Sequence, residues 1–380
     1  MNAHTTITPF RIEIPQSALD DLEARLSRTR WAATPPGRDD RADFSRGIPQ
    51  PYLRELVEHW RDGFDWQAQE AALNAFPQLL TEIEGQTFHA VHVASSNPDA
   101  TPLLLCHGWP GSFIEYRHLI PLLTEDFHVV VPSPPGFGFS TPLSSTGWEV
   151  GRTAEAYGEI MTRLGYDRFV AHGSDLGSGI VSQLASVHPE RVIATHLAGE
   201  QRLLGLVGVI FPMPDGLTPE EQSALAPLAT EAASERGYLE MQNHKPDTIG
   251  AALADSPLGQ LAWIAEKFKT RGDRHPTPSY SVDCNDLLAN VSLYWFTNSG
   301  ESSAQFYYEA AHSGMLPAMG APVPAGWAVF DTHPLVRRVM DPQQMIGHWT
   351  EFAEGVMRPG FSGDSAHLIS TSSLALVTPA

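Results

Sequence analysis

The chain of 380 residues has few cysteines, few basic side chains and no long apolar run. Its two cysteines, Cys106 and Cys284, are too few for a disulfide framework. A single bridge between them is not expected in a cytosolic protein. Lys and Arg number 24 against 44 Asp and Glu, which gives a formal net charge of −20. This acidic balance argues against nucleic acid and against anionic membranes as partners.

The sequence also shows no secretory signal, no membrane span and no internal repeat. Its first ten residues lack a basic segment followed by an apolar one. The most apolar run, residues 203–211, is about half as long as a membrane-spanning helix requires. We therefore expect a cytoplasmic protein, with homodimer formation left open. Apolar residues make up 42% of the chain, which is enough for a large core.

Changes of pattern divide the chain into four predicted regions. Residues 1–95 form an N-terminal arm with two amphipathic helices, within 16–28 and 52–64. Residues 96–199 form the first part of an α/β core, and residues 200–320 form a helical cap rich in aromatic side chains. Residues 321–380 form the second part of the core, with a tail of atypical composition. Short apolar strands are expected at 88–93, 103–106, 128–132, 168–172, 191–197, 327–331 and 345–352. Their alternation with helices predicts a mostly parallel, doubly wound α/β sheet.

A tight turn follows the expected strand at 168–172. It reads Gly173-Ser174-Asp175-Leu176-Gly177, which matches the nucleophile elbow of α/β-hydrolases with aspartate in place of serine. Asp175 is ionised at pH 7, and its carboxylate can attack an electrophilic sp³ carbon to form an ester. Two alternatives stay open at this point. Asp175 is an ordinary N-cap of the next helix, or Ser174 is the nucleophile in a register shifted by one residue.

An earlier turn, His107-Gly108-Trp109-Pro110-Gly111, lies about 65 residues before Asp175. In hydrolases of this kind, the loop after an earlier strand supplies a backbone N–H to an oxyanion hole. The N–H groups of Trp109 and Leu176 are the two candidates for holding a developing oxyanion. The alternative is a plain Pro/Gly turn with a packing tryptophan. The 16 histidines are scattered, and His89 and His92 are expected on opposite faces of one strand, so no metal site is indicated.

Taken in order, the segments HGWPGS, PSPPGFGFS and GSDLGS resemble the microsomal-type epoxide hydrolases. Arm segments at 10–31 and 64–85 and cap segments at 237–268 and 287–297 resemble the same family, so the resemblance covers residues 9 to about 352. It implies an α/β-hydrolase fold with a helical cap and an N-terminal wrapping arm. It also implies a cofactor-free hydrolase that opens a hydrophobic or aromatic epoxide to a vicinal diol through an aspartyl ester.

By the same resemblance, Asp175 is the nucleophile, and Trp109 and Leu176 build the oxyanion hole. Two cap tyrosines, Tyr238 and Tyr307, hydrogen-bond the epoxide oxygen. Tyr308 is adjacent to Tyr307, which leaves an ambiguity of one residue. A phenol with a pKa of about 10 is a neutral proton donor at pH 7, which suits the opening of an epoxide.

The sequence departs from the family where the second half-reaction needs a histidine base and its acid. Met357 falls at the histidine position and His333 at the acid position, with Asp331 two residues earlier. His367 in the tail is one replacement for the missing base, and Asp331 is a candidate for the acid. His348, on the preceding strand, is another candidate base, although a histidine satisfied within the strand is the favoured interpretation of that residue. A third hypothesis is a reading-frame change near residue 355. Val-Met can be encoded GTC ATG, in which a shift of one base exposes the histidine codon CAT.

Rival functions follow from the same residues. A non-hydrolysing epoxide binder, or a protein alkylated once, accounts for the missing histidine. A haloalkane dehalogenase shares the fold and the aspartate nucleophile. Those enzymes commonly hold the halide with an indole N–H from the residue after the nucleophile, where Leu176 stands here. A serine esterase would need serine at position 175.

Overall fold

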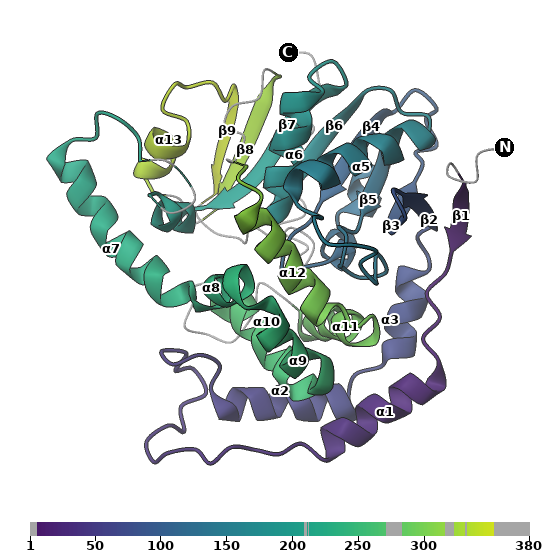
Figure 1. Cartoon of the computed structure of the whole chain (residues 1–380), viewed down its shortest axis with the longest axis vertical. Coiled ribbons are helices and arrows are strands. Elements are labelled where there is room, and N and C mark those ends of the chain that lie inside the picture. Colours follow the sequence, from purple (N-terminus) through teal and green to yellow (C-terminus); the bar gives the residue numbers. More distant parts are fainter. Residues whose placement is uncertain are drawn as a thin grey trace.

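The computed structural model describes residues 6–208, 211, 213–270, 283–315, 323–330 and 333–352. Nine strands form one sheet in the order β1-β2-β3-β5-β4-β6-β7-β8-β9 (Figure 1). The strands are β1 (Ile7–Phe10), β2 (Gln78–Ile83), β3 (Gln86–Val93), β4 (Thr101–Cys106), β5 (Phe127–Pro132), β6 (Phe169–Ser174), β7 (Val192–Glu200), β8 (Ala325–Phe330) and β9 (His348–Phe352). The pairs β1–β2, β2–β3 and β3–β5 are antiparallel, and all pairs from β5 to β9 are parallel.

This architecture confirms the predicted α/β fold with its mostly parallel, doubly wound sheet. The central strands β5 and β6 are buried along their whole length, as expected for strands covered on both faces. Each of the seven expected strands overlaps an observed one. The structure adds that the N-terminal arm contributes β1, β2 and β3 to the central sheet. The boundaries drawn at residues 95, 199 and 320 stay a prediction.

The α-helices group by position. In the arm they are α1 (Gln16–Ser27), α2 (Gln50–Asp62) and α3 (Trp66–Leu73). Against the sheet lie α4 (Ile120–Leu123), α5 (Val150–Arg163), α6 (Leu176–Val187) and α13 (Leu335–Met340). In the cap region they are α7 (Pro219–Glu235), α8 (Gly237–His244), α9 (Pro246–Asp255), α10 (Pro257–Thr270), α11 (Cys284–Phe296) and α12 (Ser299–His312). Short 3-10 helices occupy Phe113–Tyr116 and Gln201–Leu206.

The two faces of the sheet bury separate cores. Helices α5 and α6 cover one face over a core that includes Tyr157, Ile160 and Leu184. The other core continues from the sheet into the cap and the arm, through residues such as Phe137, Leu288 and Trp60. The cap helices gather at one edge of the sheet, and α1 and α2 run along their outer side (Figure 1).

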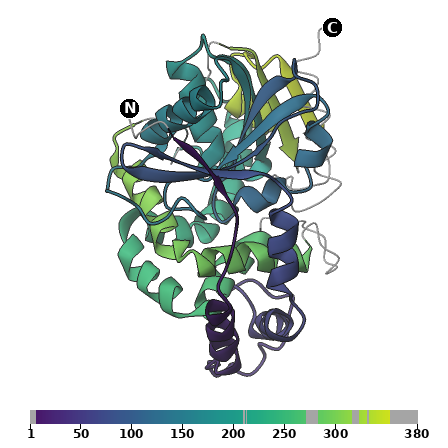
Figure 2. The same cartoon turned by 90° about the vertical axis from the view of Figure 1, so that its right-hand side faces the viewer.

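The arm is tied to the cap by contacts between distant parts of the chain. The Trp60 indole donates to Ser292 Oγ at 2.9 Å, and Arg25 Nη1 donates to the carbonyl oxygen of Asp255 at 2.7 Å. A view turned by 90° shows the arm passing from β1 down to α1 beside the cap (Figure 2). Within the described ranges, no helix is both long and apolar enough to cross a membrane.

Candidate active site

The predicted elbow is a sharp turn between β6 and α6, with Asp175 at its tip. Asp175 has φ 53° and ψ −125°, a backbone conformation that is unfavourable for a residue other than glycine. The two glycines of the motif permit the close packing around it. A Cβ on Gly173 would collide with the carbonyl of Gly177, and one on Gly177 would collide with the carbonyl of Cys106 on β4. The elbow therefore holds the Asp175 side chain at the carboxyl end of the central strands.

The side chain of Asp175 is turned toward the oxyanion loop and the cap. It occupies the N-cap position of α6 but makes no capping hydrogen bond to that helix. Its Oδ1 accepts a hydrogen bond from the Trp109 backbone N–H at 3.1 Å and another from the Tyr307 hydroxyl at 3.3 Å. The N-cap alternative is therefore wrong. Ser174, the shifted alternative, is buried and donates to Glu115 Oε1 at 3.2 Å.

The loop that carries Trp109 lies directly against the elbow. A Cβ on Gly108 would collide with Asp175 Oδ1 and with the backbone nitrogen of Leu176. The two backbone N–H groups predicted as an oxyanion hole thus meet beside the same carboxylate. Only a residue without a side chain fits at position 108. The glycine is therefore required by the close approach of Asp175, and not only by the turn.

Cap helix α11 fixes the position of this loop. Asn290 Nδ2 donates to the carbonyl of Pro110 at 2.7 Å, and the Tyr294 hydroxyl donates to the carbonyl of Gly111 at 2.8 Å. Both side chains are buried, where such bonds are stronger than in water. Sequence analysis missed these two residues, because nothing in the local pattern of α11 indicates which turn it will contact.

Both predicted cap tyrosines lie beside the nucleophile loop. Tyr307 comes from α12 and is 6% exposed, with its hydroxyl on Asp175. Tyr238 comes from α8, and its ring stacks on that of Trp109 at a centroid distance of 4.9 Å and an interplanar angle of 10°. Tyr308 is 39% exposed and stacks on His312 instead. Of the two adjacent tyrosines, Tyr307 is therefore the one that contacts Asp175.

The residues predicted for water activation are placed only in part. His367, Asp331 and Met357 lie outside the described residues. The Nδ1 of His333 accepts a hydrogen bond from the Leu335 N–H at 3.1 Å, so its ring caps the start of α13. His348 is the first residue of β9, and its Nε2 is 3.2 Å from Thr350 Oγ1.

The sheet register keeps His348 away from Asp175. His348 pairs with Gly326, Gly326 pairs with His196, and His196 pairs with His172. These four residues form one row across the sheet. His172 precedes Asp175 by three residues on β6, which corresponds to about 10 Å along a strand. His348 therefore lies at the start of the outermost strand β9, in the row of His172, and not at the carboxyl ends of the strands where Asp175 stands.

This row contains a buried histidine pair that the sequence did not single out. The Nδ1 atoms of His172 and His196 are 2.8 Å apart, and both side chains are fully buried. Burial lowers the pKa of His172 to about 4. Burial, and then the nearby His172 and His348, hold the pKa of His196 well below its usual value. Both rings are therefore neutral at pH 7, with one nitrogen donating to the other.

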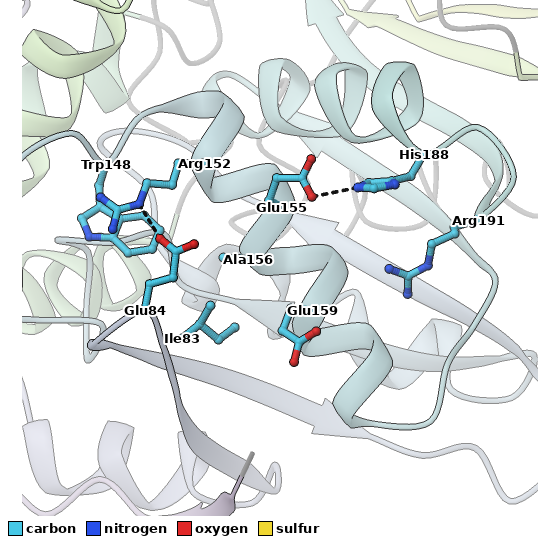
Figure 3. Close-up of a pocket in the computed structure, with 9 residues that line it drawn as sticks. All are labelled: Ile83, Glu84, Trp148, Arg152, Glu155, Ala156, Glu159, His188 and Arg191. Carbon is cyan, nitrogen blue, oxygen red and sulfur yellow. Dashed lines mark hydrogen bonds and ion pairs between the residues drawn. The ribbon is translucent and has the colours of Figure 1, made fainter. Parts of the chain in front are cut away.

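A pocket lies beside α5, lined by residues that include Glu84, Arg152 and His188 (Figure 3). It has a volume of about 280 Å³. Its charged side chains have protein partners: Arg152 donates to Glu84 at 2.9 Å, and His188 lies 2.8 Å from Glu155. The guanidinium of Arg191 donates to Thr162 Oγ1 and to backbone carbonyls. None of the predicted site residues lines this pocket.

Comparisons with known proteins point to one family. Residues 7–116 match the model "Epoxide hydrolase N terminus", and residues 101–233 match the model "alpha/beta hydrolase fold". A protein of Stigmatella aurantiaca (strain DW4/3-1), provisionally described as an epoxide hydrolase, is 43% identical over 337 residues and covers 85% of this chain and 74% of that protein. Epoxide hydrolase 1 of Sus scrofa is 34% identical over 365 residues, covering 87% of this chain and 79% of that protein.

Solved structures agree with these relatives. The Aspergillus niger epoxide hydrolase superposes with a TM-score of 0.82 at 29% identity, covering 98% of this chain and 96% of that chain. The juvenile hormone epoxide hydrolase from the silkworm Bombyx mori gives a TM-score of 0.82 at 27% identity, covering 98% and 94%.

Proposed function

Because the chain belongs to the epoxide hydrolase family, we propose that this hydrolase opens a hydrophobic or aromatic epoxide through a covalent ester on Asp175. The observation that carries this proposal is the double hydrogen bond to Asp175 Oδ1, from the Trp109 N–H and the Tyr307 hydroxyl. A carboxylate at the tip of a strained turn, oriented by two donors, is positioned for attack rather than for structural support.

In the first half-reaction, the second oxygen of Asp175 forms a bond to one epoxide carbon. The two donors orient the carboxylate through Oδ1, so that Oδ2 is the attacking atom. As the epoxide C–O bond breaks, its oxygen takes a proton from a cap phenol. Tyr307 and Tyr238 flank Trp109 from two different helices, which gives the epoxide oxygen one donor from each side.

In the second half-reaction, water attacks the carbonyl carbon of the Asp175 ester. The charge that develops on the former Oδ1 falls on the N–H groups of Trp109 and Leu176, which supply the oxyanion hole. Water activation needs a base. We assign this role to His367, with Asp331 as its orienting acid, while a reading-frame change near residue 355 stays the rival explanation of the missing family histidine.

A single-turnover protein is the second candidate function, because the ester-forming residues are all present and the family histidine is replaced by Met357. Haloalkane dehalogenation is disfavoured, since Leu176 offers no indole N–H to a departing halide. The proposed protein is cytoplasmic and takes a small-molecule epoxide as its substrate. Homodimer formation is a further proposal, and the acidic surface and the fold are compatible with it.

The test is intact-mass and peptide-mapping spectrometry after exposure of the full chain to styrene oxide. We expect an adduct of one epoxide on Asp175, followed by accumulation of diol over many turnovers. Asp175→Asn abolishes the first mass increase, whereas the control Asp167→Asn, at an exposed carboxylate, leaves it unchanged. An adduct that never hydrolyses supports the single-turnover candidate. Reaction that survives in Asp175→Asn refutes the assignment of the nucleophile.

A further inference from the structure

The chain contains three lysines against 21 arginines, and one of the lysines is buried beside the proposed active site. Lys267 lies on α10 with a side chain that is only 6% exposed. Its ammonium is over the ring of Tyr238, 5.0 Å from the ring centroid. Burying a lysine ammonium costs free energy unless the charge is paired. The position of Lys267 against this ring therefore needs an explanation.

Two carboxylates hold the ammonium in place. Lys267 Nζ donates to Glu266 Oε1 at 2.8 Å and lies 3.7 Å from Glu235 Oε2, at the end of α7. Glu266 is on the same helix, and its side chain is 19% exposed. The lysine is therefore fixed from two helices, and it connects α7 and α10 to the ring of Tyr238 on α8.

The Tyr238 ring in turn contacts the loop of the proposed oxyanion hole. It stacks on Trp109, whose backbone N–H bonds Asp175. The path from Lys267 to Asp175 thus runs through two stacked rings and one hydrogen bond. A cation over an aromatic face attracts the ring, and it favours the phenolate that remains after a phenol gives up its proton.

The two cap tyrosines are not equivalent in this arrangement. The Tyr307 proton is already engaged with a carboxylate oxygen of Asp175. Tyr238 lies next to a cation. Resting on the proposed function, we propose that Lys267 is a positioning residue that holds the Tyr238 ring against Trp109 and assists proton donation by Tyr238 to the opening epoxide.

The proton balance of this step is simple. The Asp175 carboxylate forms the C–O bond of the ester, and the epoxide C–O bond breaks. The Tyr238 proton moves to the released oxygen, and the phenolate that remains faces the Lys267 ammonium until solvent returns a proton.

Other charged and titratable groups set the size of the effect. Glu266 on α10 and Glu235, the last residue of α7, pair with the Lys267 ammonium, and Tyr307 and Asp175 contact Trp109. Along the chain, Arg236 precedes α8, and Glu240 and His244 lie on α8 itself. Asp247 on α9 bonds to Gln305 instead. The carboxylates partly cancel the field of the ammonium at Tyr238. We therefore expect Lys267 to lower the ionisation midpoint of Tyr238 by about one pH unit, which is small among the shifts that a neighbouring opposite charge causes.

The first experiment measures the rate of adduct formation on Asp175 with styrene oxide between pH 6 and pH 10. In Lys267→Met, the rate of adduct formation at pH 7 falls by about tenfold. The fall in this rate at high pH, caused by ionisation of Tyr238, begins about one pH unit higher than in the wild type. Lys267→Arg keeps the charge and restores most of the rate. Glu235→Gln moves the decline to lower pH. The control Lys245→Met, at an exposed cap lysine, changes neither quantity.

A purely structural role for Lys267 would slow Lys267→Met without moving its pH profile, and Lys267→Arg would be equally slow. Either result overturns the proposal. The second experiment needs no substrate: tyrosine ionisation is followed by ultraviolet difference absorbance in the wild type, Tyr238→Phe and Lys267→Met. The transition that disappears in Tyr238→Phe shifts to higher pH in Lys267→Met. If the wild type forms no adduct, the proposed function fails, and this titration still decides the role of Lys267.

Discussion

Acidification is expected to destabilise this protein through its buried neutral histidines, and His89 offers a direct test. His89 lies on β3 and is fully buried. Its Nε2 is 2.9 Å from Gln78 Oε1, and its Nδ1 is 3.1 Å from Ser133 Oγ. Gln78 Nε2 donates to the carbonyl of Leu73, so the amide oxygen faces the ring. His89 therefore carries its proton on Nε2 and accepts from the Ser133 hydroxyl through Nδ1.

Burial, with a smaller effect of the nearby His107, lowers the pKa of His89 to about 3. An unfolded histidine titrates at about 6.5. Between these two values the unfolded chain binds a proton that the folded chain does not. Stability is therefore lost as the pH falls below about 6.5, and the loss continues to about pH 3. From pH 7.5 to pH 5 it amounts to about 2 kcal/mol for one such residue.

His172 and His196 are buried and neutral in the same way. Their loss of stability on acidification has the same sign as that of His89 and adds to it. Since the folding stability of a typical domain is about 5–15 kcal/mol, the chain is expected to be clearly less stable at pH 5 than near neutral pH.

Urea unfolding followed by circular dichroism at pH 7.5 and pH 5 measures this effect. We expect His89→Gln to be less stable than the wild type at pH 7.5, because the glutamine fits the ring site imperfectly. It then loses about 2 kcal/mol less than the wild type on acidification. His244→Gln, at an exposed histidine, is the control and keeps the wild-type difference. An equal loss in His89→Gln and the wild type would refute the reasoning.

Two further outcomes follow from the site geometry. Tyr307→Phe removes one of the two donors to Asp175 Oδ1 and one of the two proposed proton donors. Single-turnover adduct formation should therefore slow by about 10²-fold. An unchanged rate would show that Tyr307 has no part in the mechanism. Gly177→Ala places a methyl group against the Cys106 carbonyl and should lower the free energy of unfolding by about 2 kcal/mol or more. Gly179→Ala, whose added carbon meets Val150 at an ordinary 3.7 Å, is the matched control in urea unfolding and should be neutral or stabilising.

The elbow and the oxyanion turn were predictable because their requirements are local. Gly173 and Gly177 stand two residues either side of Asp175, and their packing needs are visible in five consecutive residues. The strand at 78–83 was missed, although Glu84 and Gly85 at the turn to the next strand both have positive φ. A glycine after an acidic residue between two apolar segments was the available signal for that hairpin.

The remaining site features depend on contacts between distant segments. Asn290 is 180 residues from Pro110, whose carbonyl it binds. His172 and His196 meet only because β6 and β7 pair in one register. Lys267 and Tyr238 come from different cap helices. Such contacts follow from the packing of whole helices and strands, and the residue types in any one segment do not determine them.

The residues proposed for the two half-reactions come from different parts of the fold. In the proposed mechanism, ester formation uses Asp175 after β6, Trp109 after β4, and Tyr238 and Tyr307 from two cap helices, all within the described ranges. Ester hydrolysis uses a base and an acid that the family supplies after β9 and β8. Since β6, β7, β8 and β9 run parallel, Phe330 and Phe352 end at the same edge of the sheet as Asp175. Substitutions in the first group are therefore expected to change adduct formation, whereas the sequence after Phe352 determines only whether the adduct persists.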